Sequence, residues 1–198
     1  MYRGDAERAV AGILKDSMCL VIARWTKQSG EVASEGRMME TIPAVHGPAP
    51  KRVASDDTFK VHRLTPSLVV GIVGWSHVTD ELLAALRADL STYDEDVVTR
   101  HMLRLKQNCP AAALQVVLMG IRDGHVHAAT WSDADPSRAF SPTHPVNRPK
   151  AIVLGDSDIA REALAMLRRD APLKVIFAAL AQKHVTINDR VRTEEVRP

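Results

Sequence analysis

Hydrophobic residues gather in a series of short stretches that turn-forming residues separate, a pattern typical of β-strands. Gly, Pro, Asn, Asp and Ser mark the breaks, and Asp123-Gly124 is a strong signal for a tight hairpin turn. The strands that this pattern predicts are Leu20–Trp25, Glu31–Ser34, Thr58–Leu64, Leu68–Gly74, Leu114–Ile121, His125–Trp131, Ala151–Leu154 and Val185–Asn188.

Other stretches carry their hydrophobic residues at helical spacing. A capping-type signal, Thr79-Asp80-Glu81-Leu82, starts the first helix. Further helices are predicted over about Asp94–Lys106, from Gly155-Asp156-Ser157-Asp158 to about Arg169, over Pro172–Lys183, and near the start over Asp5–Lys15. Proline and glycine discourage regular structure in two long loops, Met38–Asp57 and Asp135–Pro149.

The elements follow the order strands, two helices, strands, two helices, strand. Two sheets packed face to face, with a helix pair outside each, would bury this pattern, which predicts a four-layer α-β-β-α sandwich of the α+β class. The order alone also allows other α+β folds. With 198 residues, 45% of them hydrophobic, the chain suits a single compact domain.

Composition narrows the functions further. The net charge is +2 and no basic stripe forms, so nucleic-acid binding has no support. Cys19 and Cys109 make no disulfide framework, which fits a reducing compartment. The best apolar run, Leu68–Trp75, is too short to span a membrane, and charged residues interrupt any signal peptide. The sequence therefore predicts a cytoplasmic protein.

Three residues that could take part in catalysis follow one another along the predicted strands. Cys19 begins the first strand, Glu35 ends its hairpin partner, and Lys60 lies on a later strand. Desolvation and the neighbouring charge can shift the pKa of a lysine that is buried beside a carboxylate. A weakly acidic nucleophile requires a partner tuned in this way. Each residue also has a plain interpretation: a core cysteine, an exposed strand-end carboxylate and a solvent-facing lysine.

The spacing and local motifs resemble one family. Sixteen positions separate Cys19 from Glu35, Arg37 follows two residues later, and Lys60-Val61-His62-Arg63-Leu64 nearly repeats a Lys-Val-Arg-Arg-Leu motif. The chain thereby resembles the proteasome β-subunit family, especially the peptidase subunit of the bacterial two-component ATP-dependent protease. The resemblance implies an N-terminal-nucleophile hydrolase with the same four-layer fold, in which residues 1–18 form a leader and 19–198 the hydrolase domain.

The resemblance also implies roles for individual residues. Cys19 would be the nucleophile with its own amine as the base, and Ser17 is the competing nucleophile. Glu35 stands where the family has Asp, and Lys60 would favour the thiolate. Gly74 corresponds to the glycine that helps to form the oxyanion hole.

Several positions depart from the family. Trp75 replaces a small residue beside Gly74, where it would narrow the cleft or act as a packing residue. Asp156, with Ser157 next to it, replaces a serine that supports the N-terminal amine, and it could equally be a helix N-cap. The family's later Asp and Ser have no clear match around Lys183–Asn188.

No cofactor or metal is predicted. His125 and His127 share one face of a strand, which permits metal binding, but no third ligand is evident. The favoured function is a peptidase working inside a homo-oligomeric ring, fed with peptides or unfolded protein by an ATP-dependent unfoldase. The alternatives are an inactive ring or scaffold protein that keeps its leader and, ranked last, an amidase acting on small amides.

Overall fold

The computed structural model describes residues 20–41, 51–140 and 149–198. The predicted leader, its helix over Asp5–Lys15, and both Ser17 and Cys19 therefore lie outside the described residues. Within the described ranges, no helix combines the length and apolarity needed to cross a membrane.

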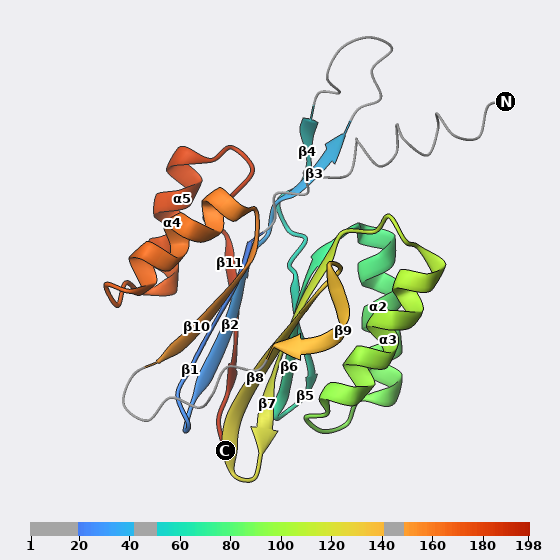
Figure 1. Cartoon of the computed structure of the whole chain (residues 1–198). Coiled ribbons are helices and arrows are strands. Elements are labelled where there is room, and N and C mark those ends of the chain that lie inside the picture. Colours follow the sequence, from blue (N-terminus) through green and yellow to red (C-terminus); the bar gives the residue numbers. More distant parts are fainter. Residues whose placement is uncertain (1–19, 42–50, 141–148) are drawn as a thin grey trace, which may run out of the picture.

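Two antiparallel sheets lie face to face (Figure 1). The first has the order β10-β1-β2-β11, with β10 at Lys150–Gly155, β1 at Leu20–Trp25, β2 at Gly30–Glu35 and β11 at Val191–Val196. The second has the order β5-β6-β7-β8-β9, with β5 at Val61–Thr65, β6 at Leu68–Gly74, β7 at Leu114–Arg122, β8 at His125–Ser132 and β9 at Asp135–Phe140. A separate hairpin, β3 (Met38–Thr41) and β4 (Lys51–Ser55), projects from the sandwich (Figure 1).

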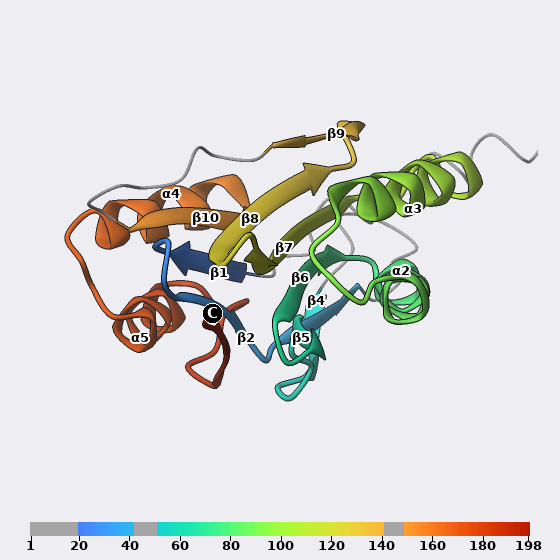
Figure 2. The same ribbon diagram turned by 90° about the horizontal axis from the view of Figure 1, so that it is seen from below.

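Helix pairs cover the outer faces of the two sheets (Figure 2). Helices α2 (Ser76–Asp89) and α3 (Glu95–Asn108) pack on the second sheet, and α4 (Ser157–Leu167) and α5 (Leu173–Lys183) pack on the first. Three apolar clusters fill the spaces between the layers, and the middle cluster joins the two sheets. The predicted four-layer α-β-β-α sandwich is thus confirmed.

Strand β1 is largely apolar because both of its faces are covered. Val21 and Ala23 belong to the cluster between the sheets, whereas Leu20 and Ile22 belong to the cluster beneath α4 and α5. All four side chains are fully buried. A strand covered on both faces reads as a continuous hydrophobic run, so its predicted bounds agree with the observed ones.

The predicted hairpin turn at Asp123-Gly124 is also confirmed. Both residues have a positive φ, 53° at Asp123 and 71° at Gly124, and Arg122 pairs directly with His125. Positive φ at both central positions is the geometry of a type I′ turn, whose twist matches that of the flanking strands.

Three local predictions are wrong. Val185–Asn188 forms no strand; Ile187 is buried in a turn that follows α5, and the last strand is β11. The loop predicted at Met38–Asp57 contains β3 and β4, and the loop predicted at Asp135–Pro149 contains β9. Pro136 is compatible with β9 because β9 is an edge strand.

The start of the first predicted helix is wrong as well. Helix α2 begins at Ser76, before the predicted capping signal, and its N-cap residue Trp75 makes no capping hydrogen bond through its side chain. Burial of Val78, Leu82 and Leu86 stabilises this helix on the second sheet, so packing determines its start here.

Candidate active site

A buried ion pair lies at the end of the sandwich where β2 stops. Lys60 Nζ is 2.7 Å from Glu35 Oε1, and the Glu35 side chain is fully buried while that of Lys60 is 9% exposed. The ammonium also donates to the backbone oxygens of Glu35, at 3.2 Å, and of Arg37. Three acceptors match the three N–H donors of a lysine, which offsets part of the cost of burying its charge.

Backbone contacts fix where this pair lies. The amide of Lys60 donates to Ser34 Oγ at 3.0 Å, and its carbonyl accepts from the amide of Ile72 at 2.9 Å. Lys60 therefore spans the gap between β2 in the first sheet and β6 in the second. Glu35 is one methylene longer than the Asp that the proteasome β-subunit family has at this position, and its carboxylate contacts the lysine directly.

The carboxylate of Glu35 also contacts the start of β1. Its Oε1 accepts from the amide of Leu20 at 3.2 Å, and its Oε2 accepts from the amide of Arg37. Burial raises the pKa of the Glu35 carboxyl, while the charge of Lys60 and these hydrogen bonds oppose the rise. Because Leu20 directly follows Cys19 in the chain, the ion pair is tied to the residue next to the predicted nucleophile.

A polar network that the sequence did not reveal supports the turn after Glu35. The amide of Gly36 donates to Asn188 Oδ1 at 3.1 Å, and Asn188 Nδ2 donates to Asp56 Oδ1 at 3.0 Å. Arg37 pairs with both carboxylate oxygens of Asp56, at 2.6 and 3.2 Å. Hydrogen bonds from Arg37 and Asn188 hold the pKa of Asp56 below its usual range.

Asn188 is 6% exposed and 152 positions from Gly36, so no local pattern in the sequence could signal this contact. It lies in the region where the family's later Asp and Ser were sought. Its side chain joins the loop after α5 to the segment that supplies acceptors to Lys60.

Gly74 ends β6, opposite Leu114 of β7. A Cβ atom at Gly74 would lie 2.6 Å from the backbone oxygen of Ala113, so the close packing there requires glycine. Trp75 is 8% exposed and belongs to the cluster between α2, α3 and the second sheet. Trp75 is therefore a packing residue, which is one of the two roles that the sequence left open; the other was to narrow the cleft.

Asp156 and Ser157 lie at the junction of β10 and α4. Asp156 Oδ1 accepts from the amides of Asp158, at 2.9 Å, and Ile159, at 3.3 Å, which makes it the N-cap of α4. Ser157 is the first residue of the helix and is exposed. Gly155 pairs with Leu20, so this junction lies beside the start of β1.

The two histidines of β8 contact neighbours at the hairpin turn. His125 Nδ1 lies 2.8 Å from the backbone oxygen of Asp123, and His127 Nδ1 lies 3.2 Å from Arg122 Nη2. Within the ranges that the structure covers, no three His, Cys, Asp or Glu side chains are grouped as metal ligands would be.

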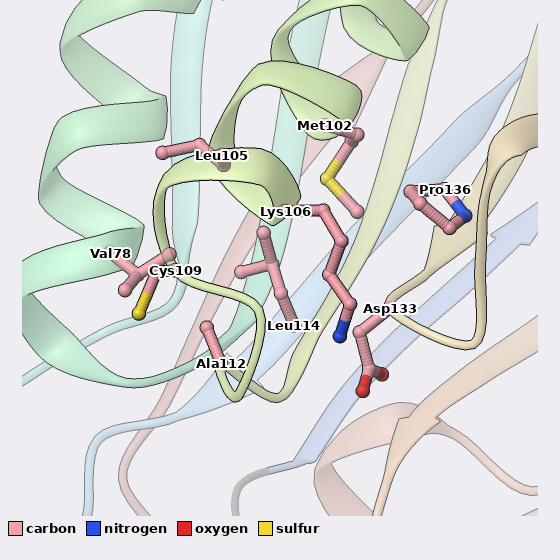
Figure 3. Close-up of a pocket in the computed structure, with 9 residues that line it drawn as sticks. All are labelled: Val78, Met102, Leu105, Lys106, Cys109, Ala112, Leu114, Asp133 and Pro136. Carbon is pink, nitrogen blue, oxygen red and sulfur yellow. The ribbon is translucent and has the colours of Figure 1, made fainter. Parts of the chain in front are cut away.

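A small apolar cavity lies away from the ion pair, in the helical layer over the second sheet (Figure 3). Its lining comes from α2, α3, β7 and β9 and the segments between them: Val78, Met102, Leu105, Lys106, Cys109, Ala112, Leu114, Asp133 and Pro136. About 10 Å³ is open to the centre of a water molecule, which is room for one water and not for a peptide.

Comparison with known proteins supports the fold. The solved structure of eukaryotic HslV from Trypanosoma brucei matches with a TM-score of 0.59 and 12% sequence identity, over 90% of this chain and 99% of that one. No family model matches the sequence, and no curated protein matches it either. At this identity the likeness shows the fold alone: the chain has the fold of HslV, a proteasome β-like N-terminal-nucleophile peptidase.

Proposed function

We propose that this chain is a proteasome-like peptidase subunit that cleaves amide bonds with Cys19 as its N-terminal nucleophile, after residues 1–18 have been removed. The observation that carries the proposal is the buried pair of Lys60 and Glu35, hydrogen-bonded through Glu35 to the amide of Leu20. A buried ammonium linked in this way to the residue after Cys19 would favour the thiolate of Cys19, which is the reactive form.

The reaction begins with the free α-amino group of Cys19. Such an amine has a pKa of about 7.7–8.0, so it can take the proton from its own thiol. The sulfur attacks the substrate carbonyl, and backbone donors at Gly74 stabilise the oxyanion. The C–N bond then breaks, the amine leaves with the proton, and water hydrolyses the thioester to release the acid and restore the thiol.

Asp156 has a second role in this scheme. Its Oδ1 is used by the cap of α4, whereas the negative charge of the carboxylate remains beside the start of β1. That charge would attract the α-ammonium form of Cys19 and orient the amine, with Ser157 next to it.

A peptidase of this kind works inside a ring of identical subunits. The sandwich has no lid domain among its described elements, so a closed chamber is what would keep folded proteins from the site. An ATP-dependent unfoldase would then supply unfolded protein, in the reducing cytoplasm that the cysteines suit.

An inactive ring or scaffold protein is the second candidate. Lys60 already uses all three N–H donors on protein acceptors, and Asp156 is engaged as a helix cap. While residues 1–18 remain attached, the nitrogen of Cys19 is an amide and cannot act as a base.

Hydrolysis of a fluorogenic peptide distinguishes the two. A chain that begins at Met18, with the initiator removed, should cleave the peptide, and the full-length chain and Cys19→Ala should not. All chains carry Cys109→Ser to remove the second thiol. Sedimentation should show a ring. If the short chain folds and assembles but shows no turnover, the peptidase proposal fails and the scaffold function stands. Cleavage of small amides alone would favour the amidase.

A further inference from the structure

A second link between the two sheets lies at the same end of the sandwich as Lys60. The Oε1 atom of Gln115, on β7, accepts from the amide of Gly155, at the end of β10, at 2.9 Å. Gln115 lies on the face of β7 that also carries Val117 and Met119 toward the first sheet. Its side chain is half-buried.

The two links flank the middle of the site. In the first sheet β1 lies between β10 and β2, and in the second β6 lies between β5 and β7. Lys60, just before β5, reaches the end of β2, and Gln115 of β7 reaches the end of β10. The start of β1 and Gly74 at the end of β6 therefore lie between the two links.

The contact with Gly155 also determines how the carboxamide is oriented. An amide N–H can only donate, so the oxygen of Gln115 must face Gly155 and the NH₂ group must point elsewhere. Among the residues with described positions, none accepts a hydrogen bond from this NH₂ group. Two donors are thus held on a fixed carboxamide, on the opposite side of β1 from the ammonium of Lys60.

We propose that Gln115 is a substrate-binding residue of this site, and the inference rests on the proposed peptidase function. Its Nε2 donates to a backbone carbonyl of a bound peptide, while its Oε1 holds the junction of Gly155 and Asp156 beside β1. A side-chain amide fixed by a backbone partner loses little freedom when it binds, which favours such a role.

Two substitutions separate the roles of the carboxamide. Gln115→Glu keeps an acceptor for Gly155 and removes both donors, whereas Gln115→Met keeps the length and removes both functions. Gln28→Glu places the same charge on an exposed turn at the other end of the sandwich and is the matched control.

The experiment measures peptide affinity in the short chain with Cys19→Ala, by titrating a peptide into ¹⁵N-labelled protein, and KM and kcat in the same chain with Cys19. Losing one hydrogen bond should raise Kd and KM about tenfold in both Gln115 variants and leave Gln28→Glu unchanged. The melting temperature should fall in Gln115→Met and not in Gln115→Glu, because only the former leaves the Gly155 amide unpaired.

The outcomes distinguish the inference from the proposed function. Equal Kd and KM in all chains would overturn the role of Gln115 and leave the peptidase intact. Affinity that depends on Gln115 without any turnover would support the role and overturn the catalysis. Absence of peptide binding to every chain would overturn both.

Discussion

The two ends of the sandwich are built differently. At the end that holds the candidate site, Lys60 and Gln115 cross from one sheet to the other and bond to groups where β2 and β10 stop. At the opposite end, Gly30 is so tightly packed that a Cβ would lie 2.4 Å from Met119 Sδ. The buried Lys60 and the half-buried Gln115 make the polar links at the first end. At the other end the polar links are those of the partly exposed Arg63 to Glu194 and to the backbone oxygen of Glu195, and a backbone hydrogen bond from Val126 to Lys27.

A hollow of about 380 Å³ lies at the opposite end. The charged residues that line it are paired with their neighbours: Arg24 with Glu31, and Arg197 with Glu195. These pairs are partly or largely exposed, where ion pairs contribute little to stability. Among the described strands and the loops at their ends, the buried polar side chains (Ser34, Glu35, Lys60, Thr186 and Asn188) lie at the end that holds the candidate site, where the proposed chemistry needs them.

Loss of Lys60 should have the largest effect. Lys60→Met leaves the buried carboxylate of Glu35 without its cation, so urea unfolding should show a loss of about 3–5 kcal/mol. A second chain, with Glu35→Gln and Lys60→Met together, should regain part of that stability because no buried charge remains. Wild-type stability in the single variant would show that the pair is not the polar support of this end.

A matched pair of glycines compares the two ends directly. Gly74→Ala adds a Cβ 2.6 Å from the backbone oxygen of Ala113 and should cost about 1–3 kcal/mol, whereas Gly30→Ala adds one 2.4 Å from the flexible Met119 Sδ and should cost less. Only Gly74→Ala should slow the reaction of Cys19 with a peptide electrophile, since the backbone at Gly74 is the proposed oxyanion donor. Equal reaction rates in the two variants would remove Gly74 from the site.

Asp156 should have a smaller effect. Asp156→Ala removes the N-cap of α4 and should cost about 1 kcal/mol in thermal unfolding. Asp156→Ser keeps a capping oxygen, so its stability should stay close to wild type. If the carboxylate also orients the α-amine, Asp156→Ser should still change the pH profile of turnover. An unchanged profile would reduce Asp156 to a cap.

The smallest expected effect concerns pH and Asp56. Hydrogen bonds lower its folded pKa, so its contribution to stability is present above its unfolded pKa of 3.8 and is lost as pH falls through the folded pKa. Asp56→Asn should therefore lower the melting temperature more at about pH 6 than at about pH 3. The same difference at both values would mean that the Arg37 and Asn188 contacts do not depend on the carboxylate charge.

Strands with apolar faces were predictable from the sequence, and strands without them were not. Leu20–Trp25 and Leu68–Gly74 are almost entirely buried, and their predicted bounds are correct. Strand β11 has the sequence VRTEEV and is mostly exposed, so its residues carry no hydrophobic signal. The apolar residues before it, around Ile187, are buried in a turn and were predicted as a strand instead.

The site was predictable where a local motif marks it. The Lys60 motif and the spacing to Glu35 pointed to residues that do form an ion pair. Asn188 and Gln115 were missed because their partners lie far along the chain. Asn188 bonds to Gly36 and Asp56, 152 and 132 positions away, and Gln115 bonds to Gly155, 40 positions away. Contacts of this kind are created by the tertiary packing of distant segments, and no periodicity in the sequence records them.

Mass spectrometry can test the proposed role of Cys19 directly, by locating the adduct of a peptide electrophile on the chain that begins at Met18. With Cys109 present as an internal comparison, the account predicts rapid labelling of Cys19, slow labelling of Cys109, and loss of the Cys19 adduct in Lys60→Met. If the short chain folds and labels Cys19 no faster than the full-length chain does, the catalytic account is contradicted and the scaffold account stands.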